Sequence, residues 1–190
     1  MATFFIEEKT FEQIDFTTSM LEKASYENCK FLNCNFESLH LFNYSFLDCT
    51  FKDCNLSMAK LSKTAFRNIH FDACKLLGLK FEDCHTFGLA FSFTACNLNH
   101  SSFYSLKIKG TKFINCSLQE VDFTDTDLSN ADFTDCNLLK ATFSNTNLQK
   151  ADFSTAYNFS IHPEANLLKK AKFSMHHLSG LLHQYQIEIV

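Results

Sequence analysis

Nine cysteines and eight histidines are the residues of this 190-residue chain that could bind a metal ion or act as nucleophiles. The histidines form no H-E-x-x-H motif, and although His176, His177 and His183 lie close together, we interpret them as surface residues. No Ser-His-Asp arrangement stands out among the many polar residues, and no glycine-rich phosphate-binding loop is present. The sequence therefore indicates neither an enzyme nor a bound metal or cofactor.

The cysteines share one position of a five-residue pattern that runs along the chain. They are Cys29, Cys34, Cys49, Cys54, Cys74, Cys84, Cys96, Cys116 and Cys136. Cysteine is a compact hydrophobic residue that suits a narrow buried site. Stacked thiols would not converge on a tetrahedral metal ion, and their parallel side chains disfavour disulfides even where Cα atoms about 4.8 Å apart are within reach. We therefore expect nine free thiols.

The elements that position these thiols follow from the same pattern, whose central residue is nearly always large and apolar. A period of five matches neither an α-helix nor a β-strand, so the chain must turn a corner at every block. Four blocks make a square coil of about 20 residues, and coils stacked at the strand spacing of about 4.8 Å form a parallel β-solenoid. The scarcity of glycine (4) and proline (1) argues against a sandwich or barrel with conventional turns. The sequence predicts an all-β solenoid of about eight coils.

One column of central residues consists entirely of phenylalanine. Its predicted members are Phe11, Phe31, Phe51, Phe71, Phe91, Phe113, Phe133, Phe153 and Phe173. The regular spacing is interrupted once, and we place two extra residues between Phe91 and Cys96, within the segment of Ser92, Phe93, Thr94 and Ala95. This interruption is interpreted as a bulge at a corner, with exposed Phe87 or Phe93 as a contact point in the alternative interpretation.

The blocks ADFTD (131–135), ADFST (151–155) and TDLSN (126–130) fit the pattern A-[DN]-[LF]-x-x. This pattern resembles that of the pentapeptide-repeat family, and the resemblance covers roughly residues 4–173. It implies a right-handed quadrilateral parallel β-helix in which the central residue and the small residue two positions earlier point inward. We therefore expect a β-helix over residues 1–173 and a separate ending over 174–190.

The ending is expected to be a short capping helix with Ser174 at its N-cap. Its apolar face comprises Met175, Leu178, Leu181, Leu182 and Tyr185. The last coil of a solenoid has open strand edges and needs a cover, and the remaining apolar surface can join a twofold mate. The segment is similar to the C-terminal caps of quinolone-resistance (Qnr-type) pentapeptide-repeat proteins, in which it forms the dimer interface. The resemblance thus implies a homodimer formed through residues 174–190.

A band of acidic residues without any basic residue lies between Lys112 and Lys140. Its members are Glu120, Asp122, Asp125, Asp127, Asp132 and Asp135. The resemblance implies a protein that imitates duplex DNA and binds a type II topoisomerase, either DNA gyrase or topoisomerase IV, and counters quinolones. The band could attract a basic DNA-binding groove. An ordinary solvated surface is the alternative, because Lys112 and Asp132, and likewise Glu120 and Lys140, would be neighbours on adjacent coils.

The overall charge restricts the other partners. A net charge of −4 and a pI near 6.0 argue against direct binding to nucleic acid. No apolar run is long enough to span a membrane, and the acidic residues near the start do not suit a secretory signal, so we expect a cytoplasmic protein.

Some quinolone-resistance members carry two longer projecting loops that this chain lacks. A repeat scaffold with an unrelated protein partner therefore stays open as the second hypothesis.

Overall fold

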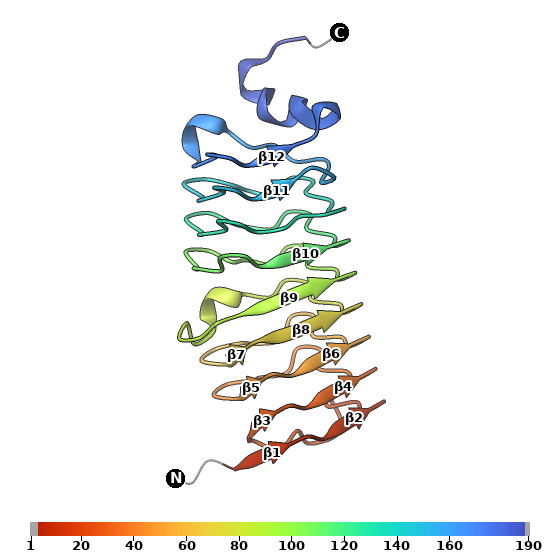
Figure 1. The fold of residues 1–190 in the computed structure, drawn as a ribbon. Helices are drawn as coiled ribbons and strands as arrows, with labels where there is room; N and C mark the ends of the chain where they lie inside the picture. The colour runs from red at the N-terminus through yellow and green to blue at the C-terminus, as the bar shows by residue number, and fades with distance from the viewer. Residues whose placement is uncertain (1–3, 189–190) are drawn as a thin grey trace.

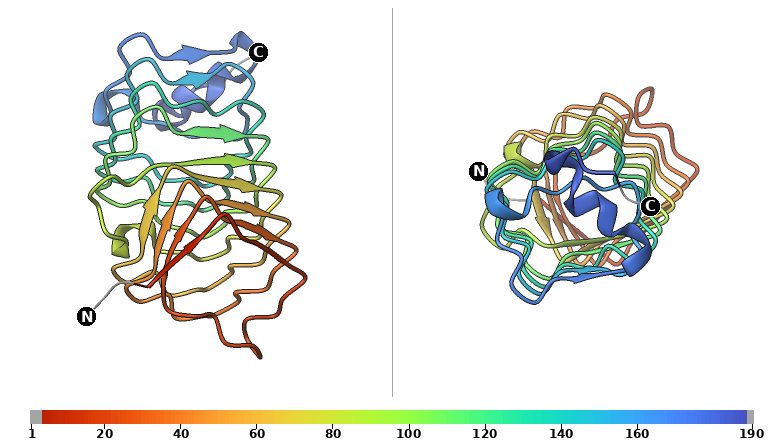
Figure 2. Two further views of the ribbon diagram at one scale, coloured as in Figure 1. Left: turned by 60° about the horizontal axis from the view of Figure 1, so that its bottom comes forward. Right: turned by 90° about the horizontal axis from the view of Figure 1, so that it is seen from above.

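The computed structural model describes residues 4–188, which wind into a right-handed, four-sided parallel β-helix of about eight coils (Figure 1). Seen along its axis in Figure 2, the coils lie over one another, and the C-terminal segment lies across the last coil. No helix among the described residues is long and apolar enough to cross a membrane. The predicted fold class is confirmed.

The strands are short and form three parallel sheets on the sides of the coil. One sheet contains β1 (Phe5–Glu7), β3 (Ser25–Glu27), β5 (Ser45–Leu47) and β7 (Ala65–Arg67). The second contains β2 (Thr10–Glu12), β4 (Lys30–Leu32), β6 (Thr50–Lys52), β8 (Ile69–Asp72), β9 (Phe91–Thr94) and β10 (Lys112–Ile114). The third pairs β11 (Asp152–Phe153) with β12 (Lys172–Phe173). Isolated parallel bridges, such as that between Asn97 and Ser117, continue the stacking elsewhere.

The corners are made by residues in the left-handed backbone region rather than by glycine-rich turns. Asn28, Asn33 and Asp48, each the last residue of its block, have φ angles of 53°, 52° and 52°. Asparagine and aspartate adopt positive φ at lower cost than most residues with a Cβ atom, because their short polar side chains can hydrogen-bond locally. This corner conformation lets the chain turn every five residues with few glycines.

The interior is filled by columns of stacked aromatic rings. Phe31 lies between Phe11 and Phe51, with ring centroids 4.9 and 4.7 Å apart and nearly parallel planes. Rings of neighbouring columns meet edge to face, as Phe113 does with Phe123 at 5.9 Å. Both geometries are favourable for aromatic pairs. The abundance of phenylalanine therefore comes from a core that repeats one contact in every coil.

The predicted phenylalanine column was wrong in one member, because Phe93 and not Phe91 continues it. Phe93 pairs with Phe71 in β8 and with Phe113 in β10, and its ring stacks on theirs at 5.3 and 5.1 Å. Phe91 pairs with Ile69 and is also buried. Both phenylalanines point inward because they are two residues apart in one strand.

The two extra residues consequently lie earlier than predicted, between His85 and Phe91. The amide of His85 still donates to the carbonyl of Thr64 in the ordinary register, whereas the pairing of Ile69 with Phe91 is displaced by two residues. A short 3-10 helix, η1 (Phe81–Asp83), precedes this loop. Ser92, Phe93 and Thr94 therefore belong to the regular strand β9, and Phe93, with none of its surface exposed, is no contact point.

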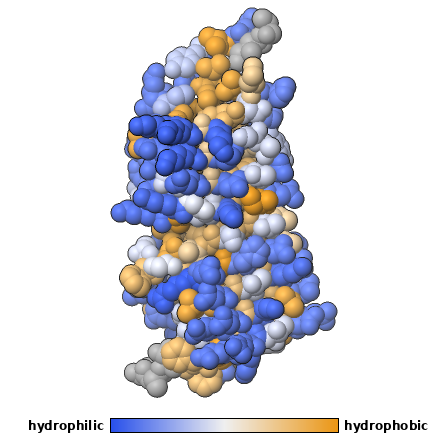
Figure 3. Space-filling model, viewed as in Figure 1, coloured by the Kyte–Doolittle hydropathy of each residue, from blue (hydrophilic) through white to orange (hydrophobic). Residues whose placement is uncertain are grey.

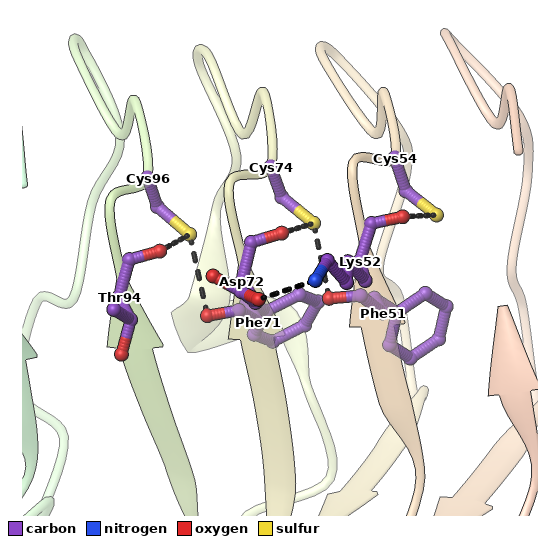
Figure 4. A network of polar contacts seen from close by, with 8 residues as sticks. All are labelled: Phe51, Lys52, Cys54, Phe71, Asp72, Cys74, Thr94 and Cys96. Atoms are coloured by element: carbon purple, nitrogen blue, oxygen red, sulfur yellow. Dashed lines mark hydrogen bonds and ion pairs between the residues drawn. The ribbon is translucent and has the colours of Figure 1, made fainter. Parts of the chain in front are cut away.

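All nine cysteines are free and buried, as expected. Cys54, Cys74 and Cys96 point the same way in successive coils (Figure 4). The Cys74 thiol donates to the carbonyl oxygen of Phe51 in the preceding coil, with an Sγ···O distance of 3.3 Å. Burial raises the pKa of Cys49 to about 12, so that thiol stays protonated and unreactive at neutral pH. The cysteines act as small core residues that also satisfy a backbone carbonyl.

Threonine fills the equivalent inward position in other blocks, and this similarity leads to a prediction. Thr64 and Thr146 are buried, and each hydroxyl donates to a carbonyl 23 residues earlier at 2.8 Å. Cys74→Thr is therefore expected to change the free energy of unfolding by less than about 1 kcal/mol, whereas overpacking by Cys74→Leu costs about 1–3 kcal/mol. Urea unfolding of both variants measures the difference, and equal losses would contradict the role of the small inward position.

The chain ends in two 3-10 helices, η3 (Met175–Leu181) and η4 (His183–Tyr185), that lie over the last coil (Figure 2). The side chain of Ser174 accepts a hydrogen bond from the amide of His176 at 3.2 Å, as its predicted N-cap role requires. The amide of Ile161 donates to the carbonyl of buried Gly180 at 2.9 Å, which ties η3 to the coil beneath it. A further 3-10 helix, η2 (Pro163–Ala165), projects from the last coil.

Candidate interaction surfaces

Three acids of the predicted band fold back onto their own turns. Oδ1 of Asp122, Asp127 and Asp132 accepts a hydrogen bond from the backbone amide two residues later, at 2.9, 3.1 and 3.0 Å. This local bond fixes the turn that leads into the corner at the end of each side. These carboxylates therefore have a structural role within the coil, although each side chain remains partly exposed to solvent.

The other three acids, Glu120, Asp125 and Asp135, occupy corners, with φ angles of 57°, 57° and 56°. The six acids are thus distributed over four consecutive sides, centred on Leu118, Phe123, Leu128 and Phe133. The repeat gives this distribution because successive blocks turn through successive corners. The structure places the acids around the rod and does not align them along one side.

Basic side chains accompany part of the band along the axis. Glu120 lies between His100 on the coil before it, at 3.4 Å, and Lys140 on the coil after it, at 3.7 Å. Asp127 pairs with Lys109 at 3.3 Å. Burial tends to raise the pKa of Asp127, but hydrogen bonds from Ser129 and the contact with Lys109 outweigh it and leave that pKa lowered. The solvated-surface interpretation is thus favoured for Glu120 and Asp127.

Asp122, Asp125 and Asp135 form no ion pair within the described residues. Asp132 also forms no ion pair among the described residues, but its backbone β-bridges place Lys112 on one adjacent coil and Asp152, which pairs with Lys172 at 2.8 Å, on the other. The part of the band that carries uncompensated charge is therefore smaller than the sequence suggested. It centres on Asp122, Asp125 and Asp135.

The predicted apolar face of the cap is divided by the structure between two directions. Leu181 packs against the core, and Leu182 is half-buried. Met175 is 86% exposed, and Leu178 and Tyr185 are also exposed. Exposed Ile187 extends this outward surface and was not among the predicted residues, although it is the next apolar residue after Tyr185. The cap thus covers the coil with one part and presents apolar side chains to solvent with another.

The loop between His85 and Phe91 is a third candidate surface. Phe87 is 75% exposed, and the guanidinium of Arg67 lies over its ring, 5.9 Å from the centroid. An open hollow of 360 Å³ beside the loop is lined by residues that include Leu89, Ile108 and Lys109. The sequence pattern indicated Phe87 but not Arg67, because the proximity of Arg67 to Phe87 depends on how adjacent coils are aligned.

Within residues 4–188, no three His, Cys, Asp or Glu side chains come together as possible metal ligands.

Comparisons with known proteins agree with this architecture. A family model described as "Pentapeptide repeat region" matches residues 15–92 and 89–153. No curated protein sequence matches the chain. Among solved structures, a trypsin-treated variant of QnrB1, a plasmid-mediated fluoroquinolone resistance protein, matches with a TM-score of 0.64 at 16% identity, covering 98% of this chain and 99% of the other.

Two further structures share the fold. A second trypsin-treated QnrB1 variant matches with a TM-score of 0.58 at 18% identity over 100% of both chains. HetL, a protein involved in heterocyst differentiation regulation from the cyanobacterium Nostoc, matches with a TM-score of 0.52 at 13% identity, covering 90% of this chain and 87% of the other. At these identities the likeness concerns the fold alone. The family model, which covers most of the chain, shows that the protein belongs to the pentapeptide repeat family.

Proposed function

We propose that this protein is a non-enzymatic mimic of DNA that binds a type II topoisomerase, DNA gyrase or topoisomerase IV, and counters quinolone action. The observation that carries the proposal is the end-to-end match with QnrB1, including the C-terminal segment, over 98% of this chain and 99% of that one. The uncompensated acids Asp122, Asp125 and Asp135 provide charge that a basic DNA-binding groove would attract. Their spread over the rod lets such a groove meet negative charge from more than one side.

The proposed active form is a homodimer joined through the cap. Met175, Leu178 and Tyr185 are exposed apolar residues at one end of the rod, where a twofold contact would bury them. A cytoplasmic location is part of the proposal, because the topoisomerase acts there on DNA. The nine free thiols support a reducing compartment. Neither direct binding to nucleic acid nor contact with a membrane is part of the proposal.

A supercoiling assay tests the proposal. The protein is expected to inhibit gyrase supercoiling or to restore it in the presence of ciprofloxacin. Combined replacement of Asp122, Asp125 and Asp135 by asparagine should weaken this effect roughly tenfold or more, because the steering charge is removed. The control variant replaces Glu27, Asp48 and Asp53 with their amides, which changes the net charge equally but lies outside the band. Loss of activity in both variants to the same extent would show that only net charge matters.

A repeat scaffold with an unrelated protein partner is the second candidate. The ion pairs of Glu120 and Asp127 favour it, because they compensate charge that a DNA mimic would expose. The fold likeness to HetL shows that the architecture is not confined to resistance proteins. If the wild-type protein neither inhibits supercoiling nor rescues it from the drug, the scaffold is the better interpretation.

A further inference from the structure

Within residues 4–188, the strands of the first coil pair on one side only. Among the described residues, β1 pairs only with β3 and β2 only with β4, so both strands lie at the edge of their sheets. The carbonyl of Lys9 accepts from the amide of Lys30, and the amide of Gln13 donates to the carbonyl of Leu32. Because amides alternate in direction along a strand, the amides of Thr10 and Glu12 point away from the second coil. These unpaired groups can accept another strand.

An apolar hollow adjoins this edge. It has a volume of 300 Å³, and Phe11, Ile14 and Phe16 are among the residues that line it. The ring of Phe11 stacks on Phe31, 4.9 Å away, but no described ring covers its other side, whereas Phe31 is stacked on both sides. Figure 3 shows apolar surface at this end of the rod. The first coil therefore offers both hydrogen bonds and a place for a large apolar side chain.

Two apolar residues of the first coil are exposed. Met20, which lines the hollow, is 90% exposed, and Phe5 in β1 is 58% exposed. The opposite end of the rod differs, because η3 and η4 lie across the last coil (Figure 2). Among the described residues, η3 and η4 thus stand between the edge strand β12 and any second copy placed against that end. The occupant must bring a strand from elsewhere.

The charge at this end selects among the remaining occupants. Residues 4–24 contain the acids Glu7, Glu8, Glu12, Asp15 and Glu22 but only two lysines, Lys9 and Lys23. Two N-terminal ends brought face to face would repel one another, and anionic lipid headgroups would be repelled in the same way. A basic polypeptide segment is attracted. A lysine on an adjacent strand can form an ion pair in this column, because Lys52 and Asp72 do so at 3.6 Å on neighbouring coils. Glu12 occupies the same column in the first coil, so a lysine on an added strand could pair with it.

We propose that β2 and its hollow dock an extended segment of another protein, which adds a strand to the first coil. A large apolar side chain of the segment stacks on the free face of Phe11, and lysine or arginine residues beside it face Glu12 and Glu7. Main-chain bonds to Thr10 and Glu12 supply affinity, and the hollow and the acids supply specificity, as in other cases of strand addition. The surface is separate from the acidic band and from the cap, and it does not depend on topoisomerase binding.

Fluorescence anisotropy with two labelled synthetic peptides tests this proposal. The peptide TKFKFKT is expected to bind, and its charge-reversed counterpart TEFEFET is not. Glu12→Lys should weaken binding of TKFKFKT tenfold or more, and high salt should weaken it as well. Asp83→Lys, an equal charge change in the middle of the rod and outside the acidic band, is the control and should leave binding unchanged. Equal binding of the two peptides, or wild-type binding by Glu12→Lys, would overturn the proposal.

Thr10→Pro tests the main-chain part of the interaction. Proline removes an amide that points outward, so the ladder to β4 keeps its bonds and the melting temperature should remain close to that of the wild type. Peptide binding should nevertheless fall tenfold or more. If Thr10→Pro instead changes the oligomeric state measured by sedimentation, the end joins copies of this chain and the proposed occupant is wrong. Topoisomerase inhibition by Glu12→Lys should equal that of the wild type, which separates this test from that of the proposed function.

Discussion

Replacement of Phe113 by alanine is expected to lower the free energy of unfolding by about 3–5 kcal/mol. None of the surface of Phe113 is exposed, and its ring lies between those of Phe93 and Phe133 at 5.1 and 5.2 Å. It also meets Phe103 and Phe123 edge to face. The narrow interior is held by backbone ladders on its sides and cannot collapse onto the missing ring, so the cavity persists.

Urea unfolding followed by circular dichroism measures this loss. Phe87→Ala removes the same side chain from an exposed loop and is the matched control, with an expected change within about 0.5 kcal/mol. Phe113→Leu should lie between the two, because leucine fills the central position in other columns, as Leu118 does. If Phe113→Ala and Phe87→Ala cost the same, the stacked column is not the source of stability that the packing indicates.

Gly180→Ala is expected to detach the cap and to convert the proposed dimer to a monomer. A Cβ atom at Gly180 would overlap the backbone carbonyl oxygen and the ring of Phe159, neither of which can move without disturbing the last coil. The bond between the Ile161 amide and the Gly180 carbonyl would be lost with this displacement. We expect overpacking to lower the free energy of unfolding by about 1–3 kcal/mol. The displaced cap would also move Met175 and Leu178 out of the proposed dimer contact.

Light scattering at micromolar concentration and thermal unfolding measure the two effects. Gly110→Ala is the control, since its Cβ would meet nothing within 4 Å and only the positive φ of 68° opposes it. That variant should lose about 1–2 kcal/mol of stability and remain a dimer. A monomeric wild-type protein would refute the dimer. Wild-type stability of Gly180→Ala would instead contradict the close packing of η3 on Phe159.

The sequence predicted the coil because a strict period of five admits few other backbones. The burial of Cys74 and the stacking of Phe31 follow directly from their positions in a block. The place of the two extra residues did not follow, because Phe91 and Phe93 are the same residue type and both fit the interior. Only the pairing of Phe93 with Phe71 distinguishes them, and that pairing depends on the coil above as well as the coil below.

The interaction surfaces were less predictable than the core. The repeat correctly gave Lys140 as a neighbour of Glu120, since they are one coil apart. It did not give the pair of Lys109 with Asp127, which are 18 residues apart and meet because a flexible lysine reaches diagonally to the adjacent coil on the same side. A helical pattern also shows which residues share a face but not which part of that face lies over the coil, so the burial of Leu181 and the exposure of Met175 required the structure.

The loop between His85 and Phe91 absorbs two residues, yet the pairing on the C-terminal side returns to steps of 20, as between Lys112 and Asp132. An insertion of this kind is a local event, because each coil takes its register from its immediate neighbours. Whole coils can then be gained or lost by duplication or deletion of about 20 residues, each altering the length of the rod by about 4.8 Å. Rod length is therefore a heritable variable that selection can adjust in fixed increments, while the surfaces at the two ends are inherited unchanged.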